Sequence, residues 1–294
     1  MPANRKELLR KARRIEIRSR KLVSMAMAGE YQSVFRGTGV EFESVREYVF
    51  GDDVRSIDWN VTARTGKPHV KRFVESRERS VILALDRSAS LDFGSDGRTK
   101  AELAAEVSAV LALAAHQNRD RVGMTLFTDQ VEMFLPPDRR EGWPHQLLHH
   151  LLFHQVKGTR TDLALALSDL EGRIRHRSVI FLVSDFLDPL PTEILARIRR
   201  RHDLIAVCVR DPREARLEGT GLVACVDPED GERFLLDAGS KEERRQFERL
   251  ARIRNEERRQ TFRRLAVEQL ELRTDLEILP PLLRFFERRE RRKR

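Results

Sequence analysis

The sequence predicts an α/β protein with a doubly wound, mostly parallel sheet, preceded by an N-terminal helix and a small β-rich module. Two observations carry this prediction. Short, mostly apolar runs at residues 80–86 and 178–185 are typical of buried parallel strands. These runs alternate with segments of helical periodicity, which is the pattern of a sheet covered by helices on both faces. With 294 residues the chain has the length to bury ~75% of its unfolded surface.

The elements follow in order along the chain. Residues 1–28 read as a basic helix that Gly29 ends, and residues 29–78 are short segments punctuated by glycines, which predicts small strands and turns. The α/β domain spans 79–284, and 285–294 is a basic tail with a frayed end at 288–294. Within the domain we expect strands at 80–86, 121–127, 178–185, 204–210, 222–227, 233–236 and 270–274, and helices at 100–117, 143–155, 162–174, 191–201, 241–269 and from 281.

Composition narrows the class of protein. The chain is 40% hydrophobic and 35% charged, which excludes collagen-like and disulfide-scaffold proteins. No run approaches the ~18 apolar residues of a membrane helix, and the N-terminus lacks the apolar region of a signal peptide. Cys208 and Cys225 lie in apolar runs and are expected to be buried, reduced thiols. These features together predict a cytoplasmic protein with no membrane span.

The net charge of +9 is unevenly distributed. Residues 1–28 carry 9 Lys and Arg against 2 Glu, and residues 240–294 carry 18 Lys and Arg against 11 acidic residues, so the body is acidic. Basic ends can bind nucleic acid. The apolar spacing in 241–269 instead favours an ordinary solvated helix, and aromatic residues make up only 6% of the chain, so nucleic-acid binding is the less favoured reading.

Polar side chains follow the expected strands where those strands end. Asp86, Ser88 and Ser90 form an Asp-x-Ser-x-Ser loop after the first strand, and Asp185 ends a second. The segment Gly158-Thr159-Arg160-Thr161-Asp162 precedes a helix. Carboxyl ends of parallel strands meet at one edge of a sheet, so these loops should converge. Carboxylate and hydroxyl oxygens suit Mg²⁺, whereas each motif alone also fits helix caps and turns.

These residues resemble the metal-ion-dependent adhesion site of the von Willebrand factor A-like family. The resemblance implies a Mg²⁺ site, or one for another divalent cation. Its metal ligands would be Asp86, Ser88, Ser90, Asp185 and Thr159, with Thr161 as the alternative to Thr159. An acidic side chain of a protein partner would complete the shell. One departure is Phe186, which stands where many such domains have glycine.

A second resemblance covers almost the whole chain. Its signature runs through Gly37-x-Gly39-x-Glu41-Phe42, Gly51-Asp52-Asp53-x-Arg55-x-Ile57-Asp58-Trp59 and Thr62-Ala63-Arg64-x-Gly66-x-Pro68. It resembles a bacterial family catalogued as a domain of unknown function, whose members commonly accompany MoxR-type AAA+ ATPases. The resemblance implies that the chain is an adaptor or partner of such an ATPase.

Residues 51–68 of this signature have two readings. The segment could bind a partner or cover the metal site. It could equally be a small β layer whose Asp52, Asp53, Arg55 and Asp58 pair internally and whose Trp59 fills its core. The second reading is favoured because buried charges need partners.

Other candidate sites are weaker. His145, His149, His150 and His154 share helix faces in pairs, but no third zinc ligand is evident. No P-loop and no G-x-S-x-G elbow is present. We therefore expect a Mg²⁺-binding protein-interaction module rather than an enzyme. The alternatives are a metal-dependent phosphoester hydrolase, and nucleic-acid binding through the basic ends.

Overall fold

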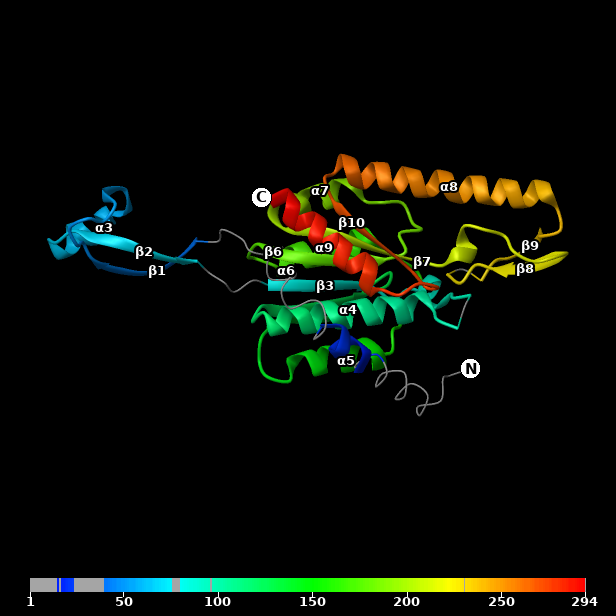
Figure 1. Ribbon diagram of the computed structural model, residues 1–294, viewed down its shortest axis with the longest axis horizontal. Helices are drawn as coiled ribbons and strands as arrows, with labels where there is room; N and C mark the ends of the chain where they lie inside the picture. The colour runs from blue at the N-terminus through cyan, green and yellow to red at the C-terminus, as the bar shows by residue number, and fades with distance from the viewer. Residues whose placement is uncertain are drawn as a thin grey trace. The chain divides into compact units, whose positions relative to one another are not determined.

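The computed structural model describes residues 15, 17–23, 40–75, 80–95, 97–229 and 231–293 (Figure 1). The chain forms two compact units, one of residues Phe35–Arg79 and one that comprises Met1–Val34 and Ser80–Arg294. Most of the helix expected at 1–28, and the start of the module expected at 29–78, lie outside the described residues. Residues 17–22 are helical.

A six-stranded sheet forms the centre of the large unit. Its strands lie in the order β10 (Glu268–Arg273), β7 (Asp203–Arg210), β6 (Ser178–Ser184), β3 (Ser80–Asp86), β4 (Arg121–Phe127) and β5 (Val131–Asp138). All neighbours are parallel except β5, which runs antiparallel to β4. The mostly parallel, doubly wound sheet confirms the expected fold class.

Helices cover both faces of this sheet (Figure 1). Helices α6 (Leu163–Arg173), α7 (Thr192–Arg201) and α8 (Lys241–Arg264) share one apolar cluster with β3 and β6. Helix α4 (Lys100–Gln117) packs against α5 (Trp143–Phe153) and contacts β3 and β4. Thr99 begins α4 with a capping box to Glu102, which satisfies donors at the helix start.

Two short strands and one helix complete the large unit. Strands β8 (Leu222–Val226) and β9 (Arg233–Asp237) pair antiparallel, as the sequence indicates. Helix α9 (Leu279–Lys293) continues through the residues expected to fray. Arg289 is 5% exposed and pairs with Asp203 at 2.5 Å, so this part of the chain is anchored rather than loose.

The small unit is an antiparallel pair, β1 (Val40–Glu47) and β2 (His69–Glu75), joined through η2 (Val54–Ser56) and α3 (Trp59–Thr65). Asp58 begins α3 by accepting hydrogen bonds from Asn60 N and Val61 N, and Asp52 pairs with Arg46 at 2.6 Å. Internal pairing of these acids therefore occurs. The expectation that Trp59 fills a core is wrong, because Trp59 is 67% exposed.

The sheet topology locates the candidate site. The chain enters the sheet at β3, adds β4 and β5 on one side, and later adds β6, β7 and β10 on the other. The boundary between β3 and β6 is therefore the topological switch point, where open α/β sheets commonly bind ligands at the carboxyl ends of their strands. Asp86 ends β3, and Asp185 follows β6 directly.

Candidate metal centre

The loop after β3 folds back on its own carboxylate. The backbone N–H of Ser88 donates to Oδ1 of Asp86 at 2.9 Å. Ser88 begins η3 (Ala89–Asp92), but its hydroxyl makes no capping bond. That hydroxyl lies 3.1 Å from the hydroxyl of Ser90 instead. The two serines therefore point their oxygens at one place, which a simple capping role would not require.

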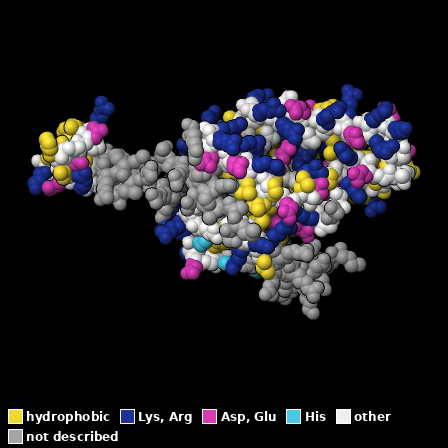
Figure 2. Space-filling model, viewed as in Figure 1, with side chains coloured by type: hydrophobic (Ala, Val, Ile, Leu, Met, Phe, Trp, Pro, Cys, Tyr) yellow, Lys and Arg dark blue, Asp and Glu magenta, His cyan; other side chains and the backbone are white. Residues whose placement is uncertain are grey.

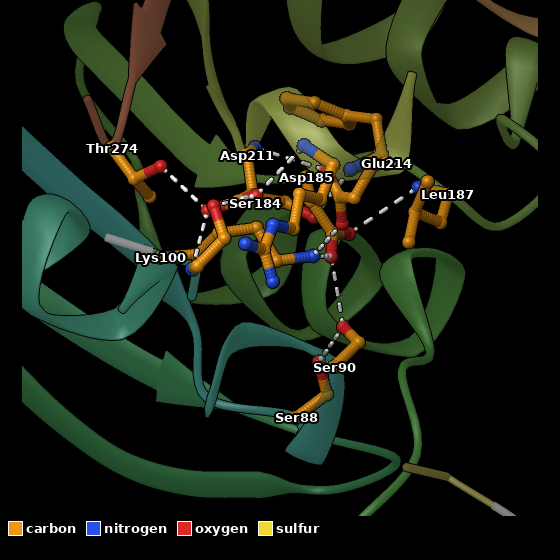
Figure 3. A network of polar contacts seen from close by, with 12 residues as sticks. Ser88, Ser90, Lys100, Ser184, Asp185, Leu187, Asp211, Glu214 and Thr274 are labelled. Atoms are coloured by element: carbon orange, nitrogen blue, oxygen red, sulfur yellow. Dashed lines mark hydrogen bonds and ion pairs between the residues drawn. The ribbon is translucent and has the colours of Figure 1, made fainter. Parts of the chain in front are cut away.

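Asp185 joins this group from the neighbouring strand. The hydroxyl of Ser90 donates to Oδ2 of Asp185 at 2.9 Å (Figure 3). The backbone N–H of Leu187 donates to the other oxygen, Oδ1, at 3.3 Å. Ser88, Ser90 and Asp185 are all at most 5% exposed. The structure thus places four of the sequence-predicted ligands together in the interior: Asp86, Ser88, Ser90 and Asp185.

Asp86 is the most buried of these residues and has 0% exposure. The hydroxyl of Ser184 donates to its Oδ2 at 2.7 Å. Burial, and then the nearby charge of Asp185, raises the pKa of Asp86 to about 7, although hydrogen bonds from Ser88 and Ser184 oppose the shift. Two carboxylates at this switch point therefore repel each other unless a cation or a proton lies between them.

One cation is supplied by the chain itself. The ammonium group of Lys100, at the start of α4, lies 2.5 Å from Oδ2 of Asp185. It also pairs with Glu214 in η4 (Pro212–Glu214). Lys100 is 1% exposed, and its two carboxylate partners raise its pKa although burial opposes them. Asp185 is thus neutralised by an internal lysine.

A polar network extends from Glu214 to the end of β10 (Figure 3). Oε2 of Glu214 accepts from the backbone N–H of Asp211 at 3.1 Å. The carboxylate of Asp211 accepts from Ser95 Oγ at 2.6 Å and from Thr274 Oγ1 at 2.7 Å. The candidate site is therefore connected to β7 and β10 through η4.

The two candidate threonines have different surroundings. The carbonyl of Thr159 accepts from Ala89 N at 2.8 Å, so its backbone lies beside the first loop, and its side chain is exposed. The hydroxyl of Thr161 donates to Glu229 at 3.0 Å. Thr159 therefore contacts the Asp86 loop, whereas the hydroxyl of Thr161 hydrogen-bonds to Glu229 instead.

Glu132 shapes the loop that carries Thr159. One oxygen of Glu132 accepts from the backbone N–H groups of Lys157 at 2.9 Å and Gly158 at 2.8 Å. A Cβ atom at Gly158 would lie 2.2 Å from the hydroxyl of Thr128, so only glycine fits this approach. The loop geometry therefore depends on backbone contacts that spacing alone does not reveal.

The loop after β6 keeps a glycine-like conformation without glycine. Phe186 has a φ of 52°, in the left-handed region. Its ring is 3% exposed and packs edge-on against Phe262, with centroids 5.2 Å apart. Packing of this ring offsets the backbone cost, ~1–2 kcal/mol, and the departure noted in the sequence leaves the Asp185 carboxylate in the site.

The donor set can be tested against Mg²⁺. Mg²⁺ binds oxygens at 2.0–2.1 Å in octahedral geometry, so neighbouring ligands lie ~3 Å apart. The oxygens of Ser88 and Ser90 lie 3.1 Å apart, and those of Ser90 and Asp185 lie 2.9 Å apart. All are hard oxygen donors, so the set fits Mg²⁺. Lys100 is the exception, because its ammonium group already occupies one side of Asp185.

Sequence reasoning missed Lys100, Ser184 and Glu214 as parts of this site. Ser184 directly precedes Asp185, and this position is a weak indication of a role in the site. Glu214 lies in a turn, where nothing in the sequence indicates such a role. The histidines of α5 were not expected to form a zinc site. Among the described residues, no group of three or more His, Cys, Asp or Glu side chains could hold a metal ion. Cys208 is buried as expected, whereas Cys225 is only partly buried.

Comparison with known proteins identifies the family. A family model described as "Protein of unknown function DUF58" matches residues 44–257. The chain belongs to this family. An uncharacterized protein of Mycobacterium tuberculosis (strain H37Rv) is 32% identical over 289 residues, which cover 95% of this chain and 89% of that protein. The DUF58 match spans the Asp86 and Asp185 loops as well as η2 and α3.

Solved structures resemble the fold at low identity. An aerotolerance-related membrane protein from Bacteroides fragilis superposes with a TM-score of 0.51 at 14% identity, and the match covers 73% of this chain and 99% of that one. The BatB protein from Bacteroides thetaiotaomicron gives a TM-score of 0.48 at 13% identity and covers 72% of this chain and 99% of that one.

The expected cytoplasmic location is corrected by the Bacteroides fragilis match, since that neighbour is a membrane protein. The reason for the error is physical: an α/β domain of this kind folds in water whether or not its host protein is attached to a membrane. Among the residues that the structure describes, no helix is both long and apolar enough to cross a bilayer.

Proposed function

We propose that this DUF58 protein is a protein-interaction module that binds Mg²⁺, or another divalent cation, at the switch point of its sheet. The observation that carries the proposal is the convergence of Asp86, Ser88, Ser90 and Asp185 in one buried oxygen cluster. When bound, the cation would supply charge neutralisation and fix the loops that hold it. Thr159 is the further ligand that we propose from its loop.

The residues around the cluster support binding rather than catalysis. The side chains that contact Asp86 and Asp185 are serine hydroxyls and the paired ammonium group of Lys100. Among the described residues, these contacts bring no histidine and no third carboxylate to the two aspartates as a general base, so the arrangement favours binding over hydrolysis of a phosphoester. The nucleic-acid reading is weakened too, because Arg289 of the basic C-terminus is buried in an ion pair.

The small unit supports an interaction role independently. Four of its apolar side chains are exposed: Phe50 at 99%, Trp59 at 67%, Val49 at 61% and Val54 at 60%. They lie in η2, in α3 and in the turn after β1, and we call these four residues the apolar face of the small unit. Figure 2 shows exposed hydrophobic side chains on this unit. Aromatic side chains of this kind commonly anchor protein interfaces. This exposure favours the partner-binding reading of the signature segment.

We propose a MoxR-type AAA+ ATPase as the partner, on the strength of the resemblance carried by residues 37–68. The four clustered ligands, Asp86, Ser88, Ser90 and Asp185, are at most 5% exposed. A partner's carboxylate would therefore reach the cation only if the loop around Ser90 moved. Direct coordination by the partner is therefore a second step. The first contact would be made by the exposed apolar face.

The experiment is a capture assay with the purified ATPase and the full chain, in Mg²⁺ and in chelator. Capture should weaken ~30-fold or more in Phe50→Ala and Trp59→Ala, in line with the loss of an aromatic anchor. Phe234→Ala is the matched control, because Phe234 is also exposed, at 47%, but lies in β9. Equal capture by all three variants would contradict the interaction face. Equal capture with and without chelator would contradict a role for the metal.

A further inference from the structure

A second candidate site lies in the large unit, away from the buried oxygen cluster. A cavity of about 820 Å³ opens between the end of β7, η4, β10 and the helices α8 and α9. Its basic lining is entirely arginine, with no lysine. The guanidinium groups come from Arg210, Arg216, Arg258, Arg259, Arg273 and Arg284.

Among these arginines, Arg258 gives the strongest evidence for a bound ligand. Its side chain is 4% exposed, and it donates from Nη2 to Glu271 at 2.9 Å. Its Nε and Nη1 atoms are also buried, yet neither has a hydrogen-bond partner among the described residues. Arginine keeps its proton, so each buried donor without an acceptor costs free energy that an acceptor from a ligand would recover.

Five carboxylates also line the cavity, those of Asp211, Glu218, Glu271, Asp275 and Glu277. Three of them have partners other than the lining arginines: Glu218 pairs with Arg213, Glu277 pairs with Arg18, and Asp211 accepts from Ser95 and Thr274. Glu271 serves two guanidinium groups, since Arg259 also donates to it at 2.7 Å. Arg210 lies opposite Arg273 in the β7–β10 register and has no ion pair in the described part of the chain, whereas Arg273 pairs with Asp275. Burial, and then the charge of Arg258, lowers the pKa of Arg210. The six arginines of the lining thus exceed its five carboxylates by one positive charge.

The remaining walls define what else the cavity would accept. Pro212, Leu276, Pro280 and Pro281 line it with apolar surface. Guanidinium groups are planar and match the paired oxygens of phosphate and carboxylate groups. We propose that this cavity binds a small organic anion, with its phosphate or carboxylate group held by Arg258 and Arg210 and its apolar part against the prolines.

The site is independent of the proposed metal but adjoins its network. Asp211 and Pro212 line the cavity, and Glu214 of the same turn pairs with Lys100. Binding of the anion is therefore measured in chelator, where no metal is bound. The result then does not depend on whether the metal proposal is correct.

The experiment is calorimetric titration of the full chain with phenyl phosphate, benzoate and inorganic phosphate. We expect saturable binding of at least one of the two organic anions, more tightly than inorganic phosphate. Tighter binding of phenyl phosphate than of benzoate assigns the site to phosphates, and the reverse order assigns it to carboxylates. Absence of saturable binding by all three probes overturns the proposal.

Variants test whether the binding is at this cavity. Arg210→Gln and Arg258→Gln should weaken binding ~10-fold or more, the effect of losing a charged hydrogen bond. Arg284→Gln, at an exposed rim position, keeps the test valid if the buried variant Arg258→Gln fails to fold. Arg252→Gln is the matched control, because Arg252 is an exposed arginine of α8 that is not among the cavity's lining residues. Undiminished binding in both Arg210→Gln and Arg284→Gln overturns the proposal.

Discussion

The ammonium group of Lys100 lies 2.5 Å from Oδ2 of Asp185, and the two side chains are 1% and 3% exposed. The same Asp185 oxygen accepts from Ser90, which belongs to the proposed metal shell. Lys100 and a divalent cation would therefore compete for one carboxylate. In this arrangement the lysine would stabilise the metal-free protein and would lower the affinity for the proposed metal.

Replacement of Lys100 should separate its effect on the stability of the metal-free protein from its effect on the affinity for the metal. Lys100→Met leaves Asp185 and Glu214 without their buried cation, so the metal-free protein should lose ~3–5 kcal/mol of unfolding free energy. The same variant should bind Mg²⁺ more tightly than the wild type. Urea denaturation in chelator and calorimetric titration of Mg²⁺ measure the two quantities.

Lys241→Met is the control for this comparison, since Lys241 is exposed at the start of α8. It should change the unfolding free energy by no more than ~0.5 kcal/mol. Weaker Mg²⁺ binding in a folded Lys100→Met protein would show that the lysine assists the metal instead of competing with it.

The raised pKa of Asp86 predicts a pH dependence of stability. Its pKa is about 7 in the folded metal-free protein, against ~3.9 in an unfolded chain. Between these values the folded state holds a proton that the unfolded state has released. The free energy of unfolding should therefore fall as the pH rises through this window, by at most ~1.4 kcal/mol per pH unit.

Denaturation in chelator between about pH 4 and pH 8 measures this slope. Asp86→Asn removes the titrating group and should abolish that part of the slope, whereas Asp92→Asn, at an exposed position of the same loop, should retain it. If Asp86→Asn and the wild type show the same pH dependence, Asp86 does not titrate as described.

At position 186 a glycine variant should be more stable than an alanine variant, which is the reverse of the usual order of stability. Both Phe186→Ala and Phe186→Gly lose the ring that packs on Phe262, at a cost of ~3–5 kcal/mol. Only glycine also relieves the left-handed backbone, by ~1–2 kcal/mol. The glycine variant should therefore be the more stable of the two by urea denaturation. A more stable alanine variant would mean that the backbone relaxes out of the left-handed region.

The two threonines should respond differently to removal of their hydroxyl groups. Thr159→Ala should weaken Mg²⁺ binding ~10-fold or more if its hydroxyl enters the shell. Thr161→Ala removes the hydrogen bond to Glu229 and should leave Mg²⁺ affinity unchanged. Calorimetric titration of both variants decides between them, and a loss confined to Thr161→Ala would assign the ligand to Thr161.

The strands of the core were predictable because burial on both faces leaves a plain apolar run. β3 and β4 match the expected ranges, and so does β6, apart from Asp185 just beyond its end. β5 was missed because Pro136 and Pro137 argue against a strand. Its place at the sheet edge tolerates them. β10 was expected two residues late, since its polar start, Glu268 and Gln269, resembles helix surface.

The site was only partly predictable, for reasons of burial. Asp86 and Asp185 end apolar strands, and strand ends meet at the sheet edge. Lys100 carries no such signal, because a lysine at a helix start is expected in water, and its burial depends on Asp185 and Glu214 from distant segments. Trp59 is the opposite case. An aromatic residue in a segment punctuated by glycines suggests a buried core position, but the Trp59 side chain is exposed.

The most direct test of the central proposal is calorimetric titration of Mg²⁺ into the chelator-treated full chain and its Asp86→Asn variant. The wild type should bind one cation per chain in a saturable manner, and Asp86→Asn should lose this binding while Asp92→Asn keeps it. Absence of saturable binding by the wild type, or equal binding by Asp86→Asn, would contradict the metal site.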